Sequence, residues 1–504
     1  MRKQYVLAVD QGTSGTKVVI IDASGRIVAS KSKEHKQYYP VPGWIEHDPV
    51  EIYTNVKSLL KEVVETANLN FEDMLVLSIT NQRDTVVVWD RQTGKPLYNA
   101  IVWQCRRTSD TCEELKKMGF EKTVKDKTGL TIDPCYSATK INWIIDNIKG
   151  TRQKAESGKI LAGTIDAWLV WKLTGGKVHA TDYTNAGNTS LLNIKTLQWD
   201  KELLEIFDVP QNMLPELKSS NSIFGKTDKD EFFSSEIPIS GIIGDSQGAL
   251  FGEQCFKPGM VKATYGTGSS IMMNTGRKLI RSKKGLVTVI AWGIDGKVEY
   301  ALEGDVTCAG DALKWVKDNL RLFERYDKAE SLVTSLKDNE GVYMVPAFSG
   351  LGAPHWDTYA RAAIIGLSRK SGREHIIRAA LESTAYQIKD IVEIMGVESG
   401  IKVKDLRING GLARSDFLVQ FQSDILDISV EKSKSEDVSI VGSAYLAGLG
   451  SGLWKSVEDI KKLKRKIESY HPAMDSATRK KYYNGWKSAV NMVLNKNTAS
   501  KGIQ

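Results

Sequence analysis

A turn near the start of the chain carries residue types that suit a phosphate group and a magnesium ion. In DQGTSGT, Asp10 is followed by Thr13 and Ser14 within a glycine-rich turn. The backbone N–H groups of such a turn point outward at an anion, and the hydroxyl side chains add further donors. The carboxylate of Asp10 can bind Mg²⁺, usually through water. An ordinary hairpin turn explains the same residues, so this motif alone does not predict a phosphate site.

A similar turn returns about half a chain later. TYGTGSS places Gly266 and Thr267 between two apolar runs, as Gly12 and Thr13 lie between the apolar runs of the first turn. We interpret the pair as a duplication, in which each half of the chain opens on a β-hairpin whose turn faces a shared cleft. Two such turns can hold a polyphosphate from both sides, so together they favour a polyphosphate site.

Two further segments have residue types that suit a reaction site. Asp245 follows the apolar run of ISGIIGDSQGALFG, and ligands of α/β sheets bind at the carboxyl ends of strands. There the carboxylate can accept a proton from a substrate hydroxyl, although a helix N-cap is the plainer explanation. Gly410 and Gly411 in LRINGGLARSDF either let the backbone approach a flat ring such as adenine or form a tight strand-to-helix turn.

The elements that must position these residues alternate between strand-like and helix-like runs, which indicates an α/β fold. Residues 4–30 predict strands joined by turns, and residues 48–67 and 374–395 carry helical patterns. The small-residue run at 436–454 is typical of a helix packed tightly on a sheet. We place a domain boundary near residue 250, which gives domains of residues 1–250 and 251–504.

The composition narrows the class of protein. The 504 residues are too many for one hydrophobic core, and no apolar run is long enough to span a membrane. The N-terminus lacks the pattern of a secretory signal. The net charge of +8 is spread along the chain, which favours a solvated surface over nucleic-acid binding. Five cysteines without metal-ligand spacing indicate a reducing compartment, so we expect a cytoplasmic protein without structural zinc.

The order of several longer motifs points to a family. DQGT, GWIEHDP, TNQRDT, YNAIVWQCRRT, TYGTG and PAFSGLGAPHWD follow one another and precede the Gly410-Gly411 pair. With them the chain resembles the FGGY carbohydrate kinases, and within that family the glycerol kinases, from about residue 5 to residue 490. The resemblance implies two ribonuclease-H-like domains of the actin and hexokinase type, with ATP and Mg²⁺ in the cleft between them. It also implies transfer of the ATP γ-phosphoryl group to a polyol hydroxyl.

Matching positions carry expected roles over from the family. Asp10 is expected to bind Mg²⁺ and to take part in catalysis, and Asp245 is expected to act as the catalytic base. The residues expected to bind ATP are Thr13, Ser14, Gly15, Lys17, Gly266, Thr267, Gly310, Lys314, Gly411 and Ser415. The residues expected to bind the substrate are Arg83, Asp84, Trp103, Cys135, Asp245, Ser246 and Ser270. Lys17 stands where the family commonly has Arg, which keeps the charge but not the forked hydrogen bonding.

Four of the expected substrate residues are smaller than those of glycerol kinases. Asp84 replaces Glu, Cys135 replaces Tyr, Ser246 replaces Gln and Ser270 replaces Phe. Because all four changes reduce side-chain volume, we expect an enlarged pocket and a polyol substrate of four to six carbons. Each lost contact with glycerol would cost about 1–3 kcal/mol of transition-state binding. The alternative is glycerol itself, with other side chains refilling the space.

Two other classes of function fit part of the pattern. An actin-like or chaperone-like ATPase would use the two phosphate turns to change shape without phosphorylating a small molecule, and an inactive kinase would act as a sensor. Retention of Arg83, Trp103 and Asp245 argues against the first class, because such an ATPase needs no small-molecule pocket. Retention of Asp10, Thr267 and Asp245 argues against the second. From the resemblance we expect a homodimer or homotetramer, a small polyol or sugar as substrate, and neither nucleic acid nor membrane as a partner.

Overall fold

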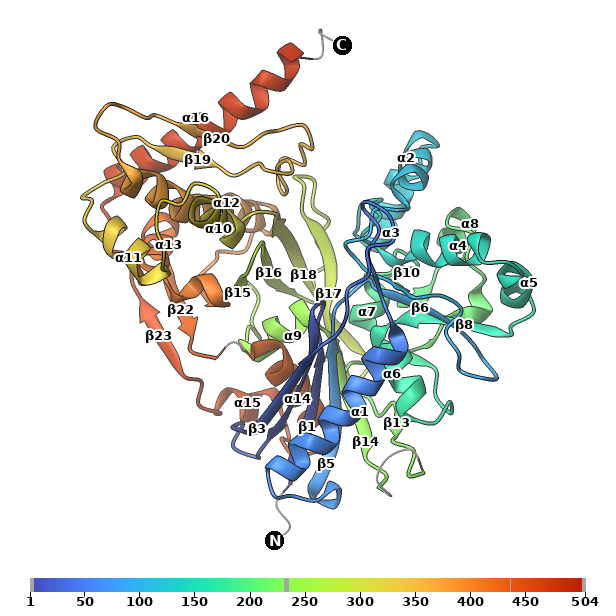
Figure 1. The fold of residues 1–504 in the computed structure, drawn as a ribbon. Coiled ribbons are helices and arrows are strands. Elements are labelled where there is room, and N and C mark those ends of the chain that lie inside the picture. The colour runs from blue at the N-terminus through green and yellow to red at the C-terminus, as the bar shows by residue number, and fades with distance from the viewer. Residues whose placement is uncertain (1–3, 231–234, 436, 501–504) are drawn as a thin grey trace.

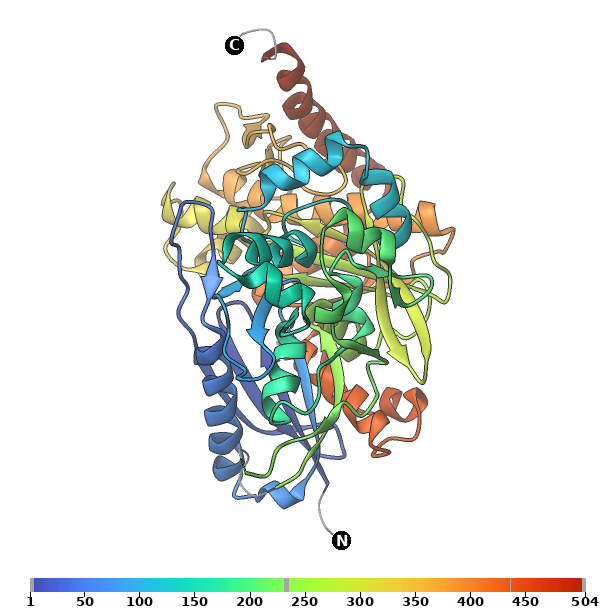
Figure 2. The ribbon, with the colours of Figure 1, turned by 90° about the vertical axis from the view of Figure 1, so that its right-hand side faces the viewer.

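The computed structural model describes residues 4–230, 235–435 and 437–500, which form two α/β domains (Figures 1 and 2). The main sheet of the first domain has the strand order β13-β14-β5-β1-β2-β3. Its strands are β1 (Tyr5–Gln11), β2 (Gly15–Ile21), β3 (Ile27–Glu34), β5 (Met74–Asn81), β13 (Gly225–Lys226) and β14 (Pro238–Gly244). The three N-terminal strands were predicted from the sequence and are confirmed.

The main sheet of the second domain has the strand order β17-β18-β16-β15-β21-β22-β23. Its strands are β15 (Val261–Tyr265), β16 (Ser269–Gly276), β17 (Val287–Ile294), β18 (Lys297–Val306), β21 (Asp405–Asn409), β22 (Ser429–Ser433) and β23 (Ile467–Tyr470). This sheet and the helices around it enclose a hydrophobic core that is separate from the core of the first domain.

The two sheets share one connectivity. β1 pairs antiparallel with β2 and parallel with β5, and β14 then pairs parallel with β5. In the same way, β15 pairs antiparallel with β16 and parallel with β21, and β22 pairs parallel with β21. The hairpins that carry the two glycine-rich turns therefore occupy equivalent central places, which confirms the predicted duplication at the level of topology.

Helices form at the three places where the sequence predicted them. The first is α1 (Pro49–Thr66), which begins after Asp48, whose side chain accepts a hydrogen bond from the Val50 N–H. The second is α12 (Arg373–Ser399), which runs through the core of the second domain. The third is α14 (Val438–Gly450), in the predicted small-residue run. In the part of the chain that the structure describes, none of the helices is both long and apolar enough to cross a membrane.

The helix α14 belongs to the second half of the sequence but packs on the sheet of the first domain (Figure 1). Ile440, Ala444 and Ala447 lie in one buried cluster with side chains of β1, β2 and β5. The helix also contacts α9 (Asp245–Gly252) so closely that a Cβ at Gly442 would lie 1.9 Å from the Gly248 carbonyl oxygen. The boundary near residue 250 stays a prediction, and the second half contributes at least this helix to the first domain.

A smaller four-stranded sheet takes three strands from the segment between β5 and β14 and one strand, β4, from the segment before β5. Its strands are β4 (Glu46–His47), β7 (Ala100–Ile101), β6 (Val86–Asp90) and β8 (Ile160–Thr164). The side chain of Arg107 is buried beside it, with its guanidinium 4.0 Å from the centre of the Trp44 ring and 2.6 Å from a carboxylate oxygen of Glu46. This packing holds the segment after β7, which contains Trp103.

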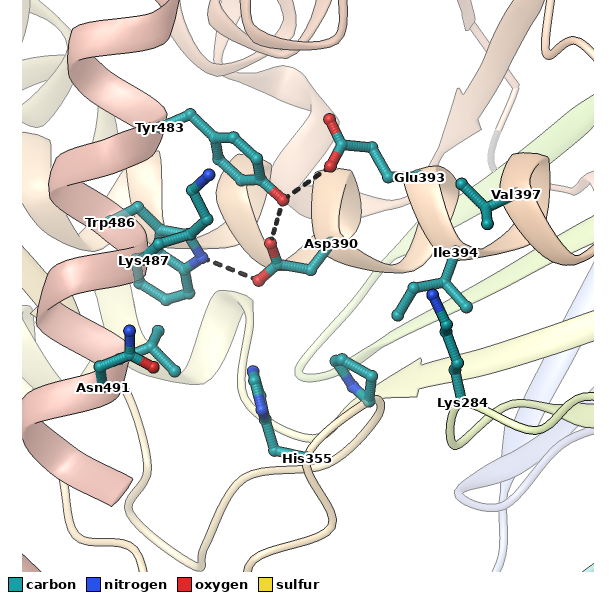
Figure 3. A pocket seen from close by; sticks show the side chains of 12 residues that line it. Lys284, His355, Asp390, Glu393, Ile394, Val397, Tyr483, Trp486, Lys487 and Asn491 are labelled. Carbon is teal, nitrogen blue, oxygen red and sulfur yellow. Dashed lines mark hydrogen bonds between the residues drawn. The ribbon is translucent and has the colours of Figure 1, made fainter. Parts of the chain in front are cut away.

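A cavity of about 370 Å³ lies between α12 and α16 (Ser476–Ser500), and the described residues that line it include none of the predicted site residues (Figure 3). Tyr483 donates to Asp390 over 2.6 Å and also contacts Glu393 over 3.0 Å, while the Trp486 indole donates to Asp390 over 2.8 Å. Trp486 is fully buried. One face of α16 is thus buried and the other is exposed.

Candidate active site

The first phosphate turn joins β1 to β2 and is fixed from behind. The Gly12 N–H donates to the Gly15 carbonyl oxygen over 2.9 Å, and the side-chain amide of Gln37 donates to the Thr13 carbonyl oxygen over 2.9 Å. A Cβ at Gly15 would lie 2.7 Å from the Lys33 carbonyl oxygen, so the neighbouring strand β3 leaves room only for glycine. Sequence reasoning missed Gln37, because nothing in a single sequence pairs it with this turn.

Asp10 lies at the end of β1, next to the first turn. Burial, followed by the negative charges of Asp245 and Asp437, raises the pKa of Asp10 to about 7, and the ammonium of Lys17 opposes this shift. The site thus gathers carboxylate oxygens with an excess of negative charge, which is the donor set that a hard divalent cation such as Mg²⁺ prefers. The residues present therefore fit the predicted ion, and Asp10 would hold it.

In the described part of the chain, Asp10 does not belong to a preformed metal site made of protein side chains. Within residues 4–230, 235–435 and 437–500, no group of three or more His, Cys, Asp or Glu side chains is placed to hold a metal ion. A Mg²⁺ ion at Asp10 would therefore take most of its ligands from water and from phosphate oxygens, as this ion commonly does. Lys17, expected to bind ATP, instead forms an ion pair with Asp437 and ties the first hairpin to the start of α14.

The second phosphate turn joins β15 to β16 and carries the start of α10 (Gly310–Asp318). The Ala309 N–H donates to the Thr267 carbonyl oxygen over 2.8 Å, and the Gly310 N–H donates to the Gly266 carbonyl oxygen over 3.0 Å. A Cβ at Gly310 would lie 2.6 Å from the Gly266 oxygen, so glycine is required for this packing. Gly266 and Thr267 themselves are exposed, and Lys314 is exposed on α10 one turn later.

The two glycines of the third segment have different roles. Gly410 has φ 100°, and a Cβ there would lie 2.5 Å from the Tyr265 carbonyl oxygen, so this residue serves backbone packing. A Cβ at Gly411 would meet no atom of the described chain within 4 Å, which leaves open space for the predicted flat ring. Ser415 is the N-cap of α13 (Asp416–Leu426), and its hydroxyl donates to Glu330 over 2.6 Å. The Ser415 side chain therefore already has structural contacts, which would compete with its expected role in binding ATP.

Arg83 contacts two of the predicted substrate residues and one acid that was not predicted. Its guanidinium donates to both carboxylate oxygens of Glu303, each over 2.8 Å, and to the Ser246 hydroxyl over 3.1 Å. Its Nε lies 3.3 Å from a carboxylate oxygen of Asp245. Gly244 makes this approach possible, because a Cβ there would lie 2.8 Å from Cγ of Arg83. Sequence reasoning missed Glu303, although an acid inside the apolar run of β18 was a visible signal.

Asp84 has a backbone conformation that suits a short acid. Its φ of 67° lies in the left-handed region, which aspartate tolerates better than most residues. One carboxylate oxygen, Oδ1, is buried and finds no hydrogen-bond partner among the residues that the structure describes, and Oδ2 lies 3.9 Å from the Cys135 sulfur. Burial raises the pKa of Asp84 to about 7, although the charge of Arg83 opposes this. An unpaired acceptor of this kind fits a substrate hydroxyl.

Trp103 joins the predicted substrate pocket to the first phosphate turn. Its backbone N–H donates to the Thr85 hydroxyl over 3.2 Å, and its indole N–H donates to the Thr13 hydroxyl over 2.9 Å. The ring remains partly exposed. A residue expected to bind the substrate and a residue expected to bind phosphate are therefore in direct contact.

The small side chains of the pocket do not simply leave empty space. The Ser270 hydroxyl lies 3.3 Å from the Ser246 hydroxyl and 3.2 Å from a carboxylate oxygen of Glu303. The buried ammonium of Lys262 donates to the same Ser270 hydroxyl over 3.2 Å. Ser246 and Ser270 therefore take part in a polar network already, which weakens the expectation that they serve as free partners for additional substrate hydroxyls.

Comparisons with known proteins agree with this arrangement. The N-terminal domain of the FGGY family of carbohydrate kinases matches residues 5–252, and the C-terminal domain of the family matches residues 261–451. A glycerol kinase of Thermoanaerobacter sp. (strain X514) is 54% identical over 97% of this chain and 99% of its own length. A glycerol kinase of Caldanaerobacter subterraneus subsp. tengcongensis is 53% identical over the same shares.

A solved structure extends the likeness from sequence to fold. The crystal structure of Plasmodium falciparum glycerol kinase with ADP has a TM-score of 0.93 and 39% identity, and the match covers 98% of both chains. The predicted α/β fold with two ribonuclease-H-like domains is thereby confirmed. The matches to both family domains, to the relatives over nearly their full length and to this structure all point to one family. The chain belongs to the FGGY family of carbohydrate kinases.

Proposed function

We propose that the chain is an ATP-dependent kinase that transfers the γ-phosphoryl group of ATP to a terminal hydroxyl of glycerol. The observation that carries this proposal is the group formed by Arg83, Asp84 and Asp245, which combines a guanidinium, an unpaired buried carboxylate oxygen and a candidate base. The similarity to glycerol kinases over nearly the whole chain supports glycerol better than the polyol of four to six carbons expected from the four small side chains.

Each residue of the site has a role in the proposed reaction. The terminal hydroxyl oxygen attacks the γ-phosphorus, its proton passes to Asp245, and the bond between the γ-phosphorus and the bridging oxygen breaks to release ADP. Arg83 and the free Oδ1 of Asp84 would hold the other hydroxyls, and the Trp103 ring would contact the carbon chain. Because phosphoryl transfer has a loose transition state, this positioning supplies most of the catalysis.

The phosphates of ATP would lie between the two glycine-rich turns, where the backbone N–H groups and the hydroxyl of Thr267 are donors. A Mg²⁺ ion at Asp10 would neutralise charge on the phosphate oxygens. Gly411 would face the adenosine. A homodimer or homotetramer in the cytoplasm is part of the same proposal and rests on the family likeness, and light scattering after size-exclusion chromatography would test the assembly.

A longer polyol is the second candidate substrate, and one observation favours it. Asp305 lies opposite Ser270 in the register of β16 and β18, and its side chain is exposed. No hydrogen bond from the described chain reaches its carboxylate, so it offers an acceptor beside the predicted pocket. A fourth hydroxyl, beyond the three of glycerol, would find a partner there.

A coupled ADP-release assay with ATP and Mg²⁺ tests both candidates. The substrates are glycerol, erythritol, threitol, the pentitols, the hexitols, inositol and the common ketoses. We expect glycerol to have the highest kcat/KM, by about tenfold or more, because a longer polyol that does not fit a glycerol-sized pocket loses about 1–3 kcal/mol for each misplaced contact. A longer polyol with the highest kcat/KM would replace glycerol as the substrate, and no turnover with any compound would contradict the kinase proposal. The Asp245→Asn variant is the control for contaminating kinases.

A further inference from the structure

One ion pair in the site joins the two domains. Arg83 follows β5 of the first domain, and Glu303 lies on β18 of the second. Both terminal nitrogens of the guanidinium donate to the carboxylate, each over 2.8 Å, and only 14% of the Arg83 side chain and 3% of the Glu303 side chain are exposed. A buried two-fold hydrogen-bonded pair of this kind fixes the direction of the guanidinium as well as its position.

The surroundings keep Glu303 charged. Although burial opposes it, the charges of Arg83 and Lys262 and a hydrogen bond from Ser270 lower the pKa of Glu303. Lys262 is itself fully buried, and burial lowers its pKa to about 8. Glu303 is thus the strongest anionic partner of both buried cations, and the next carboxylate within ion-pair distance of Arg83 is that of Asp245, at 3.3 Å.

We propose that Glu303 is a positioning residue for phosphoryl transfer, which holds Arg83 in place for the substrate and away from a full ion pair with Asp245. The inference rests on the proposed function, in which Arg83 binds the polyol and Asp245 accepts its proton. Because Glu303 comes from the second domain, the substrate pocket of the first domain is complete only when the two domains meet. Without Glu303, the guanidinium turns to Asp245 and occupies the base that the attacking hydroxyl needs.

The Glu303→Gln variant tests this directly. Removing one partner of a buried, hydrogen-bonded charge pair has a large effect, so we expect kcat/KM for glycerol to fall by about 10- to 1,000-fold. The fall should include a rise in the KM for glycerol, while the KM for ATP stays within about twofold of its wild-type value, since Glu303 faces the substrate side. We also expect Glu303→Asp, which keeps the negative charge, to recover part of the lost kcat/KM for glycerol.

A matched control separates positioning from general stability. Arg378 and Glu382 form an equally buried ion pair within α12, with 2.7 Å between Nε and a carboxylate oxygen and exposures of 6% and 1%. Glu382→Gln removes the same chemical group, and the side chains that hydrogen-bond to Glu382, those of Asn339, Arg378 and Tyr386, are not predicted site residues. We expect it to lower Tm and to leave both KM values unchanged. If Glu382→Gln changed the KM for glycerol as much as Glu303→Gln does, the positioning role would be excluded.

A second variant covers the case in which Glu303→Gln fails to fold. The double variant Glu303→Gln/Lys262→Met removes one buried anion and one buried cation, so it restores the charge balance and is expected to have the higher Tm. It should keep the defect in glycerol KM. If the folded single or double variant kept the wild-type KM for glycerol, the positioning role of Glu303 would be excluded, and the proposed kinase function would stand. If the wild-type protein itself had no kinase activity, both the proposed function and the positioning role of Glu303 would be excluded.

Discussion

Replacement of Asp10 by asparagine should stabilise the ligand-free protein at pH 8 while it abolishes kinase activity. Burial and the charges of Asp245 and Asp437 raise the pKa of Asp10 from 3.8 to about 7. The folded state therefore binds this proton more tightly than the unfolded state, so stability is lost as pH rises from the unfolded pKa to the folded pKa. About three pKa units correspond to at most about 4 kcal/mol, and more than half of this loss falls between pH 5 and pH 8.

Thermal unfolding in the presence of EDTA measures this effect at both pH values. Asp10→Asn should have the higher Tm at pH 8, with a smaller difference at pH 5. Mg²⁺ and ATP should raise the Tm of the wild type and have less effect on the variant, because the ion loses its carboxylate. A difference in Tm that does not depend on pH, or a lower Tm for Asp10→Asn at pH 8, would show that the charge of Asp10 does not destabilise the folded protein.

Asp22, at the other end of the same hairpin, is the control of opposite sign. Although burial alone would raise it, hydrogen bonds from Ser24 and Arg26 lower the pKa of Asp22. Its charge therefore adds stability above the unfolded pKa, and this stability is lost as pH falls through the folded pKa. Asp22→Asn should lower Tm at pH 8, so a general effect of removing a negative charge is distinguished from the effect at Asp10.

Three further predictions concern the base and two glycines. Asp245→Asn should lower kcat by about 10²- to 10⁴-fold with little change in the KM for ATP, and steady-state kinetics would show otherwise if the base is another residue. Gly442→Ala should cost about 1–3 kcal/mol in denaturant unfolding, because its Cβ would lie 1.9 Å from the Gly248 oxygen, and wild-type stability would contradict this tight packing. Gly411→Ala should leave Tm unchanged and raise the KM for ATP; a raised KM for glycerol alone would contradict an adenosine-side role.

The local features of the fold could be predicted from the sequence because they depend on neighbouring residues. The glycine-rich turns, the strands at residues 4–30 and the Asp-Pro start of α1 follow from turn chemistry and periodicity within a few positions. The positions of Asp10 and Asp245 at the carboxyl ends of β1 and β14 could be predicted for the same reason, since apolar runs precede both residues. The equivalent topology of the two sheets then follows from the repeated turns.

The cross-domain contacts could not be predicted in this way. Arg83 and Glu303 are separated by 220 positions, and Lys17 and Asp437 by 420 positions, so no local pattern pairs them. The expectation of an enlarged pocket had the same weakness. It compared side-chain volumes one position at a time, whereas the hydroxyls of Ser246 and Ser270 contact each other in the structure.

The most direct test of the proposed kinase activity is to follow the γ-phosphate of radiolabelled ATP in the presence of glycerol and Mg²⁺ and to identify the product. We expect the label to appear in glycerol 3-phosphate with one ADP released for each transfer, and Asp245→Asn to slow this transfer by about 10²- to 10⁴-fold. Release of the label as inorganic phosphate would indicate an ATPase that changes shape without transferring phosphate. Retention of the label on ATP would indicate an inactive kinase, and either result would contradict the central claim.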